Sequence, residues 1–197
     1  MSSSREAEKD IVLAIYKESR TVFRLNDIAM LINESDFQSL NKKLNYYVHT
    51  GKLHSPRKGI YAKPGYNPEE LACRIFTPSY ISLQYVFQKA GIVFQYDSRI
   101  TSVSYLSRVI EIGNQPFIYR KIKGSTLINT KGIVMQKNHI NIASAERAFL
   151  DFLYLEKDYH FDNLNPLNKE FVYELLPLYQ SKALTISVKK LFQNQMV

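Results

Sequence analysis

The chain has 197 residues, of which 45% are hydrophobic and 22% are charged, so it lies in the range of ordinary globular proteins. Its formal charge of +8 and its pI near 9.4 favour a polyanionic partner. The single cysteine excludes an intrachain disulfide, and no apolar stretch has the length of a membrane span or the pattern of a signal peptide. We therefore expect a cytoplasmic protein without a membrane segment.

The first 66 residues show the order helix, strand, helix, turn, helix, hairpin. Apolar residues at helical spacing over residues 7–15 predict a first helix, and Arg20–Arg24 favours a short strand. Asn26 is the expected N-cap of a second helix, and Ser35 with Gln38 has the capping-box pattern of a third. This order predicts a winged helix-turn-helix domain.

The positive charge of this first domain is concentrated in its second half. All seven acidic residues among residues 1–65 precede Phe37. From Phe37 to Lys63 there are six basic side chains and no acidic one. A run with a single sign of charge repels itself unless an anion lies against it, and duplex DNA is the most abundant candidate.

The third helix and the hairpin supply the candidate DNA contacts. The apolar stripe of the helix comprises Phe37, Leu40, Leu44 and Val48. The expected hairpin strands are Lys52–Ser55 and Ile60–Lys63, joined by the basic tip Pro56–Gly59. Amide groups bind adenine edges, and Lys reaches guanine or phosphate. We expect base reading by Gln38, Asn41, Lys42, Asn45 and Tyr46, and phosphate contacts by Lys43, His49, Arg57 and Lys58.

The domain boundary is expected after residue 66, so that residues 1–66 form the winged helix-turn-helix and residues 67–197 form an α+β domain. A short helix over Glu69–Phe76 and a helix ending at Gly91 come first. Alternating runs then predict a small antiparallel sheet, with strands at Ile100–Val103, Val109–Ile112, Phe117–Lys123, Ile133–Met135 and His139–Ile142. A helix over Ala145–Leu155, capped by Ser144, follows, and two more helices are expected after Pro166.

Glu146, Arg147 and Asp151 bring two carboxylates and a base together in the sequence. On a helix Arg147 and Asp151 are one turn apart, so the simpler interpretation is a surface ion pair. No paired acids of nuclease spacing, phosphate loop or nucleophile elbow accompanies them. We therefore expect no enzyme activity, no cofactor and no metal site.

Three segments carry a resemblance to a known family. They are Lys58–Gly65, Pro78–Leu83 and Ile142–Asp151. Together and in this order they resemble the AbiEi-type antitoxins of bacterial abortive-infection and type IV toxin-antitoxin systems. The third segment is similar to a motif usually written I-A-S-P-E-K-A-L-L-D, with Ala145, Arg147 and Phe149 in place of Pro, Lys and Leu. The resemblance extends from about Ile11 to the last helix.

The resemblance implies a repressor that binds inverted repeats in the promoter of its own operon. It also implies an antitoxin whose C-terminal module counters a nucleotidyltransferase-like toxin without a stable complex. Three alternatives remain open from the sequence. They are a scaffold whose winged helix docks a protein, a stand-alone transcriptional regulator without a toxin, and a DNA-processing enzyme with a winged-helix targeting arm.

Overall fold

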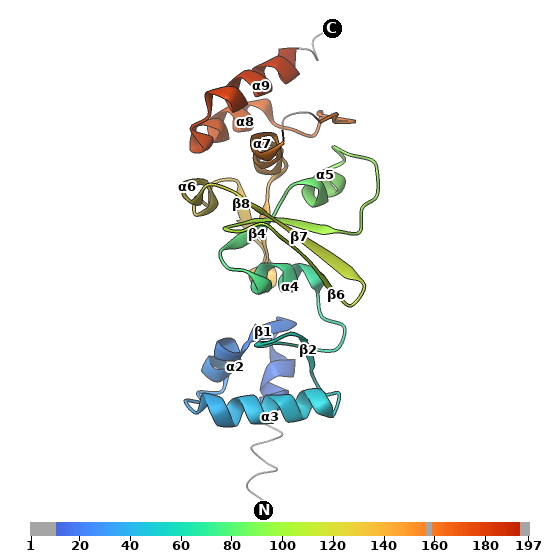
Figure 1. Ribbon diagram of the computed structural model, residues 1–197, viewed down its shortest axis with the longest axis vertical. Helices are drawn as coiled ribbons and strands as arrows, with labels where there is room; N and C mark the ends of the chain where they lie inside the picture. Colours follow the sequence, from blue (N-terminus) through green and yellow to red (C-terminus); the bar gives the residue numbers. More distant parts are fainter. Residues whose placement is uncertain (1–10, 157–158, 194–197) are drawn as a thin grey trace, which may run out of the picture. The chain divides into compact units, whose positions relative to one another are not determined.

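The computed structural model describes residues 11–156 and 159–193, and it divides into two compact units (Figure 1). Unit 1 ends at Ile75 and unit 2 begins at Phe76. The sequence places this boundary earlier, after residue 66, but helix α4 (Pro68–Ile75) contacts the sheet of unit 1. The buried Glu70 carboxylate of α4 accepts the N–H groups of two successive residues, Thr21 and Val22. The boundary therefore lies after α4.

Unit 1 combines helices with a three-stranded antiparallel sheet in the order β1-β3-β2. Residues 11–17 are helical, and the elements that follow are β1 (Val22–Arg24), α2 (Leu25–Leu31), α3 (Phe37–His49), β2 (His54–Arg57), β3 (Ile60–Ala62) and α4. These elements follow one another in the order expected from the sequence. Their core includes the fully buried Ile15, Phe23, Ile28, Leu44 and Tyr47.

The start of α2 differs from the expected one. The Asp27 carboxylate accepts the backbone N–H of Arg24 at 2.8 Å, so the helix begins at Leu25. Asn26 lies inside the first turn and is not the N-cap. A carboxylate three residues beyond the cap binds the free N–H there and complements the helix dipole.

Unit 2 is built on a six-stranded sheet in the order β6-β7-β5-β4-β9-β8. Its strands are β4 (Ser79–Ile81), β5 (Ile100–Ser104), β6 (Arg108–Ile112), β7 (Gln115–Lys121), β8 (Ile133–Met135) and β9 (Asn141–Ala143). Strand β4 pairs in parallel with β9, and β5 pairs in parallel with β7. The expectation of an antiparallel sheet is wrong at these two pairs, because β4, which the alternating runs do not predict, lies between β5 and β9, and β7 lies between β6 and β5.

The helices of unit 2 are α5 (Gln84–Ala90), α6 (Gly124–Leu127), α7 (Ala145–Leu155), α8 (Lys169–Leu175) and α9 (Lys182–Gln193), with 3-10 helices η1 (Lys137–His139) and η2 (Leu176–Tyr179). Helix α7 contacts α5, α8 and α9 and is therefore central to the helical layer (Figure 1). Among the described residues, no helix combines the length and the apolar character that a membrane crossing requires.

Candidate nucleic-acid interface

Helix α3 is fixed at its N-terminus by a carboxylate cap. The Asp36 carboxylate accepts the backbone N–H groups of Gln38 and Ser39, each at 3.0 Å. A charged oxygen at this position satisfies two unpaired donors and complements the helix dipole. The helix therefore begins at Phe37, and the capping box expected from Ser35 and Gln38 is wrong.

One face of α3 packs into unit 1. Leu40, Leu44 and Tyr47 are buried, whereas Phe37 is exposed and Val48 is half-buried. Val48 packs against the core of unit 1 as expected, and Tyr47, three residues after Leu44, joins the buried face. The five candidate base-reading residues are all exposed, and they are Gln38, Asn41, Lys42, Asn45 and Tyr46.

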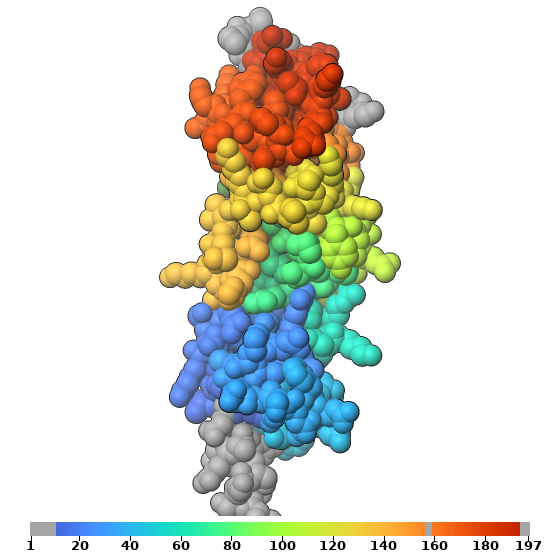
Figure 2. Space-filling view, turned by 90° about the vertical axis from the view of Figure 1, so that its left-hand side faces the viewer, coloured from blue at the N-terminus to red at the C-terminus, as the bar shows by residue number. Residues whose placement is uncertain are grey.

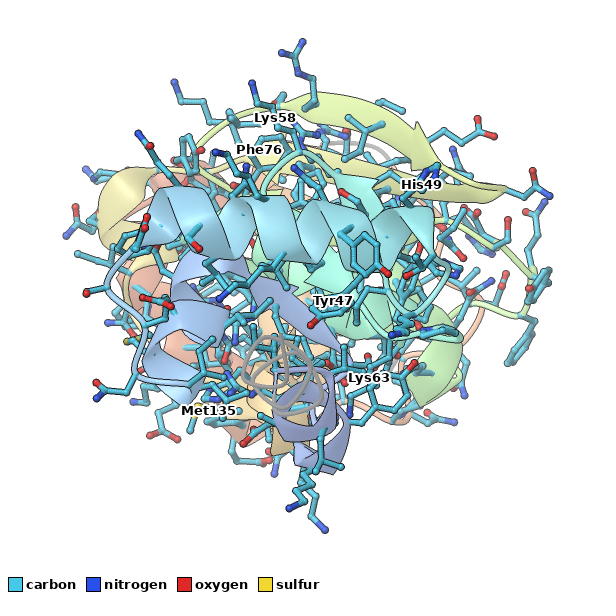
Figure 3. All side chains as sticks on the ribbon, turned by 90° about the horizontal axis from the view of Figure 1, so that it is seen from below. Tyr47, His49, Lys58, Lys63, Phe76 and Met135 are labelled. Atoms are coloured by element: carbon cyan, nitrogen blue, oxygen red, sulfur yellow. The ribbon has the colours of Figure 1, made fainter. Side chains whose placement is uncertain are left out.

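The residues on the outer side of α3 form a single row. It follows the spacing i, i+4, i+7, i+11 and comprises Gln38, Lys42, Asn45 and His49. This spacing places the row opposite the buried face. Figure 3 views α3 from outside the molecule, with His49 close to the C-terminal end of the helix. Lys43 lies on the flank and is half-buried.

A tyrosine of the hairpin holds two asparagines of α3. The Tyr61 hydroxyl donates to Asn41 Oδ1 at 2.6 Å and lies 3.4 Å from Asn45 Oδ1. Burial raises the pKa of Tyr61, so the hydroxyl keeps its proton at neutral pH. The short bond occupies one lone pair of the Asn41 oxygen and restrains its amide, whereas the Asn45 amide is held only by the longer contact. Asn45 is therefore the better candidate for reading adenine.

The β2–β3 hairpin presents two exposed cations. Arg57 ends β2, and Lys58 begins the turn, which Gly59 completes with a φ of +77°. The sequence places Pro56 and Arg57 in the turn, but both lie in β2, an edge strand that tolerates the missing N–H of proline. Figure 2 shows turquoise atoms, from the chain near residue 60, projecting from the surface of unit 1.

Two acidic side chains in the described part of unit 1 are engaged near β1 and α2. Glu70 is buried against β1, and the Asp27 carboxylate lies 3.5 Å from Arg74 Nη1. Lys63, the last cation of the acid-free stretch, turns inward, because its ammonium group donates to the Glu18 carbonyl oxygen. Burial lowers the pKa of Lys63. Lys63 is therefore a structural lysine, and the exposed cations belong to α3 and the first part of the hairpin.

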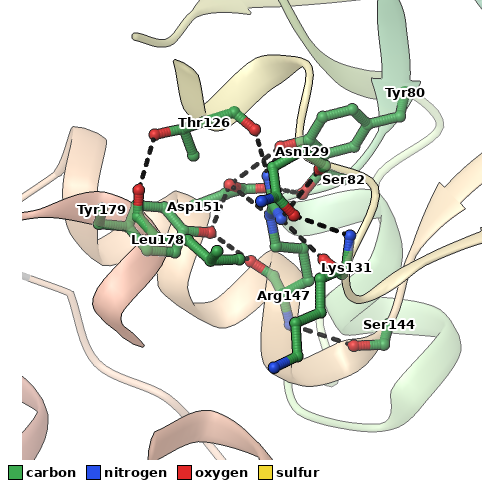
Figure 4. A network of polar contacts seen from close by, with 10 residues as sticks. All are labelled: Tyr80, Ser82, Thr126, Asn129, Lys131, Ser144, Arg147, Asp151, Leu178 and Tyr179. Carbon is green, nitrogen blue, oxygen red and sulfur yellow. Dashed lines mark hydrogen bonds and ion pairs between the residues drawn. The ribbon is translucent and has the colours of Figure 1, made fainter. Parts of the chain in front are cut away.

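A polar cluster under α7 in unit 2 corrects the expected surface ion pair. Neither Arg147 nor Asp151 has an exposed side chain, and Arg147 Nε lies 3.4 Å from Asp151 Oδ1. The guanidinium also donates to the carbonyl oxygens of Thr126, Lys131 and Asn129, at 2.7, 2.8 and 3.3 Å (Figure 4). Three backbone carbonyl oxygens therefore accept guanidinium N–H groups that the Asp151 carboxylate does not bind.

Three hydroxyl groups complete the surroundings of the Asp151 carboxylate. Tyr80 and Tyr179 donate to Oδ1 at 3.1 and 2.7 Å, and Ser82 donates to Oδ2 at 2.8 Å. Burial, together with the nearby charge of Asp151, raises the pKa of both tyrosines. Burial also raises the pKa of Asp151, an effect that the charge of Arg147 and the three hydroxyl donors oppose. The cluster joins β4 and the residue that follows it to α7 and η2.

The composition of α7 contained the signal for this burial. All residues from 147 to 153 are buried, and most are apolar. A helix that is hydrophobic on nearly all sides is typical of a protein interior, so its charged residues had to be buried with it. Glu146 is half-buried and accepts the N–H of Asn168 at 3.1 Å. Within residues 11–156 and 159–193, no three His, Cys, Asp or Glu side chains gather as a metal site.

No protein-family model and no curated protein matches the chain. Among solved structures, it is similar to the crystal structure of the RV2827C protein from Mycobacterium tuberculosis, with a TM-score of 0.54 and 12% sequence identity. The match covers 95% of this chain and 76% of that chain. At this level of identity the likeness supports the mixed α+β fold alone.

Proposed function

We propose that unit 1 is a winged helix-turn-helix domain that binds duplex DNA. In this proposal α2 and α3 form the helix-turn-helix, α3 is the recognition helix, and the β2–β3 hairpin is the wing. The observation that carries it is the exposed outer row of α3 together with the hairpin turn, within a stretch from Phe37 to Lys63 that contains six basic side chains and no acidic one. An α-helix fits the major groove, and cations beside it neutralise phosphates.

The exposed side chains divide into two groups by their chemistry. Asn45, Gln38 and Lys42 lie on the outer row of α3 and are the proposed base readers, with Asn41 and Tyr46 on the flanks. Phosphate contacts are proposed for Lys43, His49, Arg57 and Lys58, which hold the domain in register on the duplex.

We further propose that the chain represses its own operon and acts as the antitoxin of a nucleotidyltransferase-like toxin. The support is the resemblance of three segments to AbiEi-type antitoxins. Two of these segments supply the buried cluster, because Tyr80 and Ser82 belong to one and Arg147 and Asp151 to the other. The side chains of Pro78–Leu83 and Ile142–Asp151 bind one another in the interior, so each segment needs the other to satisfy its buried polar groups.

The proposal is tested by DNA binding and by co-expression. The purified chain should bind duplex DNA from the region upstream of its own gene in preference to unrelated duplex of equal length. Expression of the chain should restore the growth of cells that express the toxin-like product of the adjacent gene. Equal binding to both duplexes would contradict specific repression, and failure to restore growth would contradict the antitoxin function.

A protein-docking scaffold is the second candidate function. Three large side chains on α2 and α3 favour it, because Met30, Phe37 and Tyr46 are 74%, 45% and 51% exposed. Stable co-purification with a protein, without any retention of DNA, would support the scaffold. An enzyme reaction at Asp151 is disfavoured, since its carboxylate is buried and hydrogen-bonded.

A further inference from the structure

The segment after α5 in unit 2 exposes two aromatic rings within three residues. Phe94 is 71% exposed and Tyr96 is 85% exposed. Two neighbouring hollows of about 450 and 350 Å³ lie at this segment, and both are lined by Gln88, Val93, Gln95 and Tyr96. The larger hollow is open to solvent, and the exposed rings at this segment leave flat surfaces for a partner.

The backbone that carries these rings is held on both sides. Gln88 Nε2 donates to the Gln95 carbonyl oxygen at 2.7 Å, and the Phe94 N–H donates to Asp162 Oδ2 at 2.9 Å. The Asn163 side chain donates to the Gly91 carbonyl oxygen at 3.2 Å. The rings are therefore exposed by a structured segment, which limits the ordering cost of binding.

The side chains around the rings match the groups of a nucleotide. The primary amides of Gln84, Gln88 and Gln95 donate and accept, as the edges of nucleobases do. The Arg99 guanidinium is oriented by Asp97, with Nε at 2.7 Å and Nη2 at 2.6 Å from Oδ2, and its side chain is 53% exposed. A guanidinium in this setting suits a phosphate or the face of a base.

We propose that residues 84–99 form a stacking platform for unpaired bases of a single-stranded nucleic acid. Tyr96 and Phe94 supply the stacking faces, the glutamine amides contact base edges, and Arg99 contacts the backbone. A duplex does not fit this chemistry, because its base faces are covered by neighbouring base pairs.

This site goes beyond the proposed duplex binding and differs from it in salt dependence. Among the described residues that line the two hollows, the charged ones are Lys89, Asp97 and Arg99, so these residues neutralise few phosphates. A stacking contact by itself releases no counterions, whereas each neutralised phosphate adds to the salt dependence of binding. Single-strand binding should therefore weaken only slightly at salt concentrations that release duplex DNA from unit 1.

The test uses the full chain and fluorescence anisotropy with labelled single-stranded RNA, single-stranded DNA and duplex DNA of equal length. Tyr96→Ala should weaken single-strand binding about tenfold or more, since one stacked base contributes that much. Tyr96→Phe keeps the ring and should bind within about twofold of the parent. Tyr105→Ala is the matched control, because Tyr105 is an exposed tyrosine elsewhere in unit 2 and should leave binding unchanged.

The outcomes separate this site from the duplex site. Tighter binding of RNA than of DNA, with the same dependence on Tyr96, identifies RNA as the ligand, and the reverse identifies DNA. Absence of single-strand binding, or equal binding by the parent and Tyr96→Ala, would overturn the platform. Loss of single-strand binding on removal of Arg57 and Lys58 would overturn it as well, since binding would then belong to unit 1. Duplex binding that fails while Tyr96-dependent binding persists would contradict the proposed function alone.

Discussion

Arg147 and Asp151 form an ion pair across one turn of α7. The distance from Arg147 Nε to Asp151 Oδ1 is 3.4 Å, and neither side chain is exposed. Each charge has further partners, which are backbone oxygens for Arg147 and hydroxyl groups for Asp151. A buried pair of this kind stabilises a fold only while it is complete, because removal of one partner leaves an uncompensated charge in the interior.

Loss of one member of the pair should be severe. Arg147→Met should lower the free energy of unfolding by about 3–5 kcal/mol, and Arg147→Met with Asp151→Leu should lower it less than the single change. Urea unfolding measures both. Glu174→Gln is the control, because the Lys131–Glu174 pair is exposed and contributes about 1 kcal/mol or less. Equal losses for Arg147→Met and Glu174→Gln would contradict the buried pair.

Alkaline pH should weaken the same cluster. The pKa values of Tyr80 and Tyr179 are raised above the value of about 10 in an unfolded chain. The unfolded state therefore loses protons first, so stability is complete below about pH 10 and falls as the pH rises toward the folded pKa. Urea unfolding at a series of pH values measures this fall, which should be smaller in Tyr179→Phe. The same fall in parent and variant would exclude a contribution from Tyr179.

Local sequence signals predicted the parts of the fold that depend on neighbouring residues. The Ser144 hydroxyl accepts the Arg147 N–H, and α7 has the expected bounds because this cap and the apolar spacing lie within one segment. Strand β8 also has its expected bounds, and α5 ends at Ala90 with Gly91 as its C-cap at a φ of +68°. Each of these features depends on residues within its own segment, so it can be predicted without knowing which distant residues it contacts.

The features that the sequence did not reveal depend on contacts between distant residues. Strand β4 is only three residues long, and its neighbours β5 and β9 begin about 20 and 60 residues later. The engagement of Asn41 depends on Tyr61, which reaches it from the hairpin. Both cases concern pairing across the fold, which periodicity within one segment does not encode.

The contact of Tyr61 predicts unequal roles for two asparagines of α3. Asn45→Ala should relax sequence preference by about 1–3 kcal/mol at one base pair, because it removes the amide that the Tyr61 hydroxyl holds less tightly. Asn41→Ala should change preference less, since the Asn41 oxygen already accepts the Tyr61 hydroxyl. Binding to a library of operator variants measures both. A larger change for Asn41→Ala would contradict the assignment.

The carboxylate cap of α3 predicts unequal losses of stability for substitutions at Asp36 and Ser35. Asp36→Ala should destabilise the chain by about 0.5–2 kcal/mol, because two N–H groups lose their acceptor. Ser35→Ala should have a smaller effect, since Asp36 provides the cap. Thermal unfolding of the two variants measures both losses of stability. A larger loss of stability for Ser35→Ala would contradict the Asp36 cap and support the capping box of Ser35 and Gln38.

The central claim is that the exposed cations of α3 and the hairpin bind duplex DNA, and a salt titration tests it most directly. The affinity for duplex should fall steeply and linearly with salt on logarithmic axes. Arg57→Gln with Lys58→Gln should reduce the slope by about 2, because each lost phosphate contact removes about 0.9. Lys189→Gln with Lys190→Gln removes two exposed charges from α9 of unit 2 and should keep the parent slope. A flat titration of the parent protein, or an unchanged slope in the Arg57 and Lys58 variant, would contradict the account.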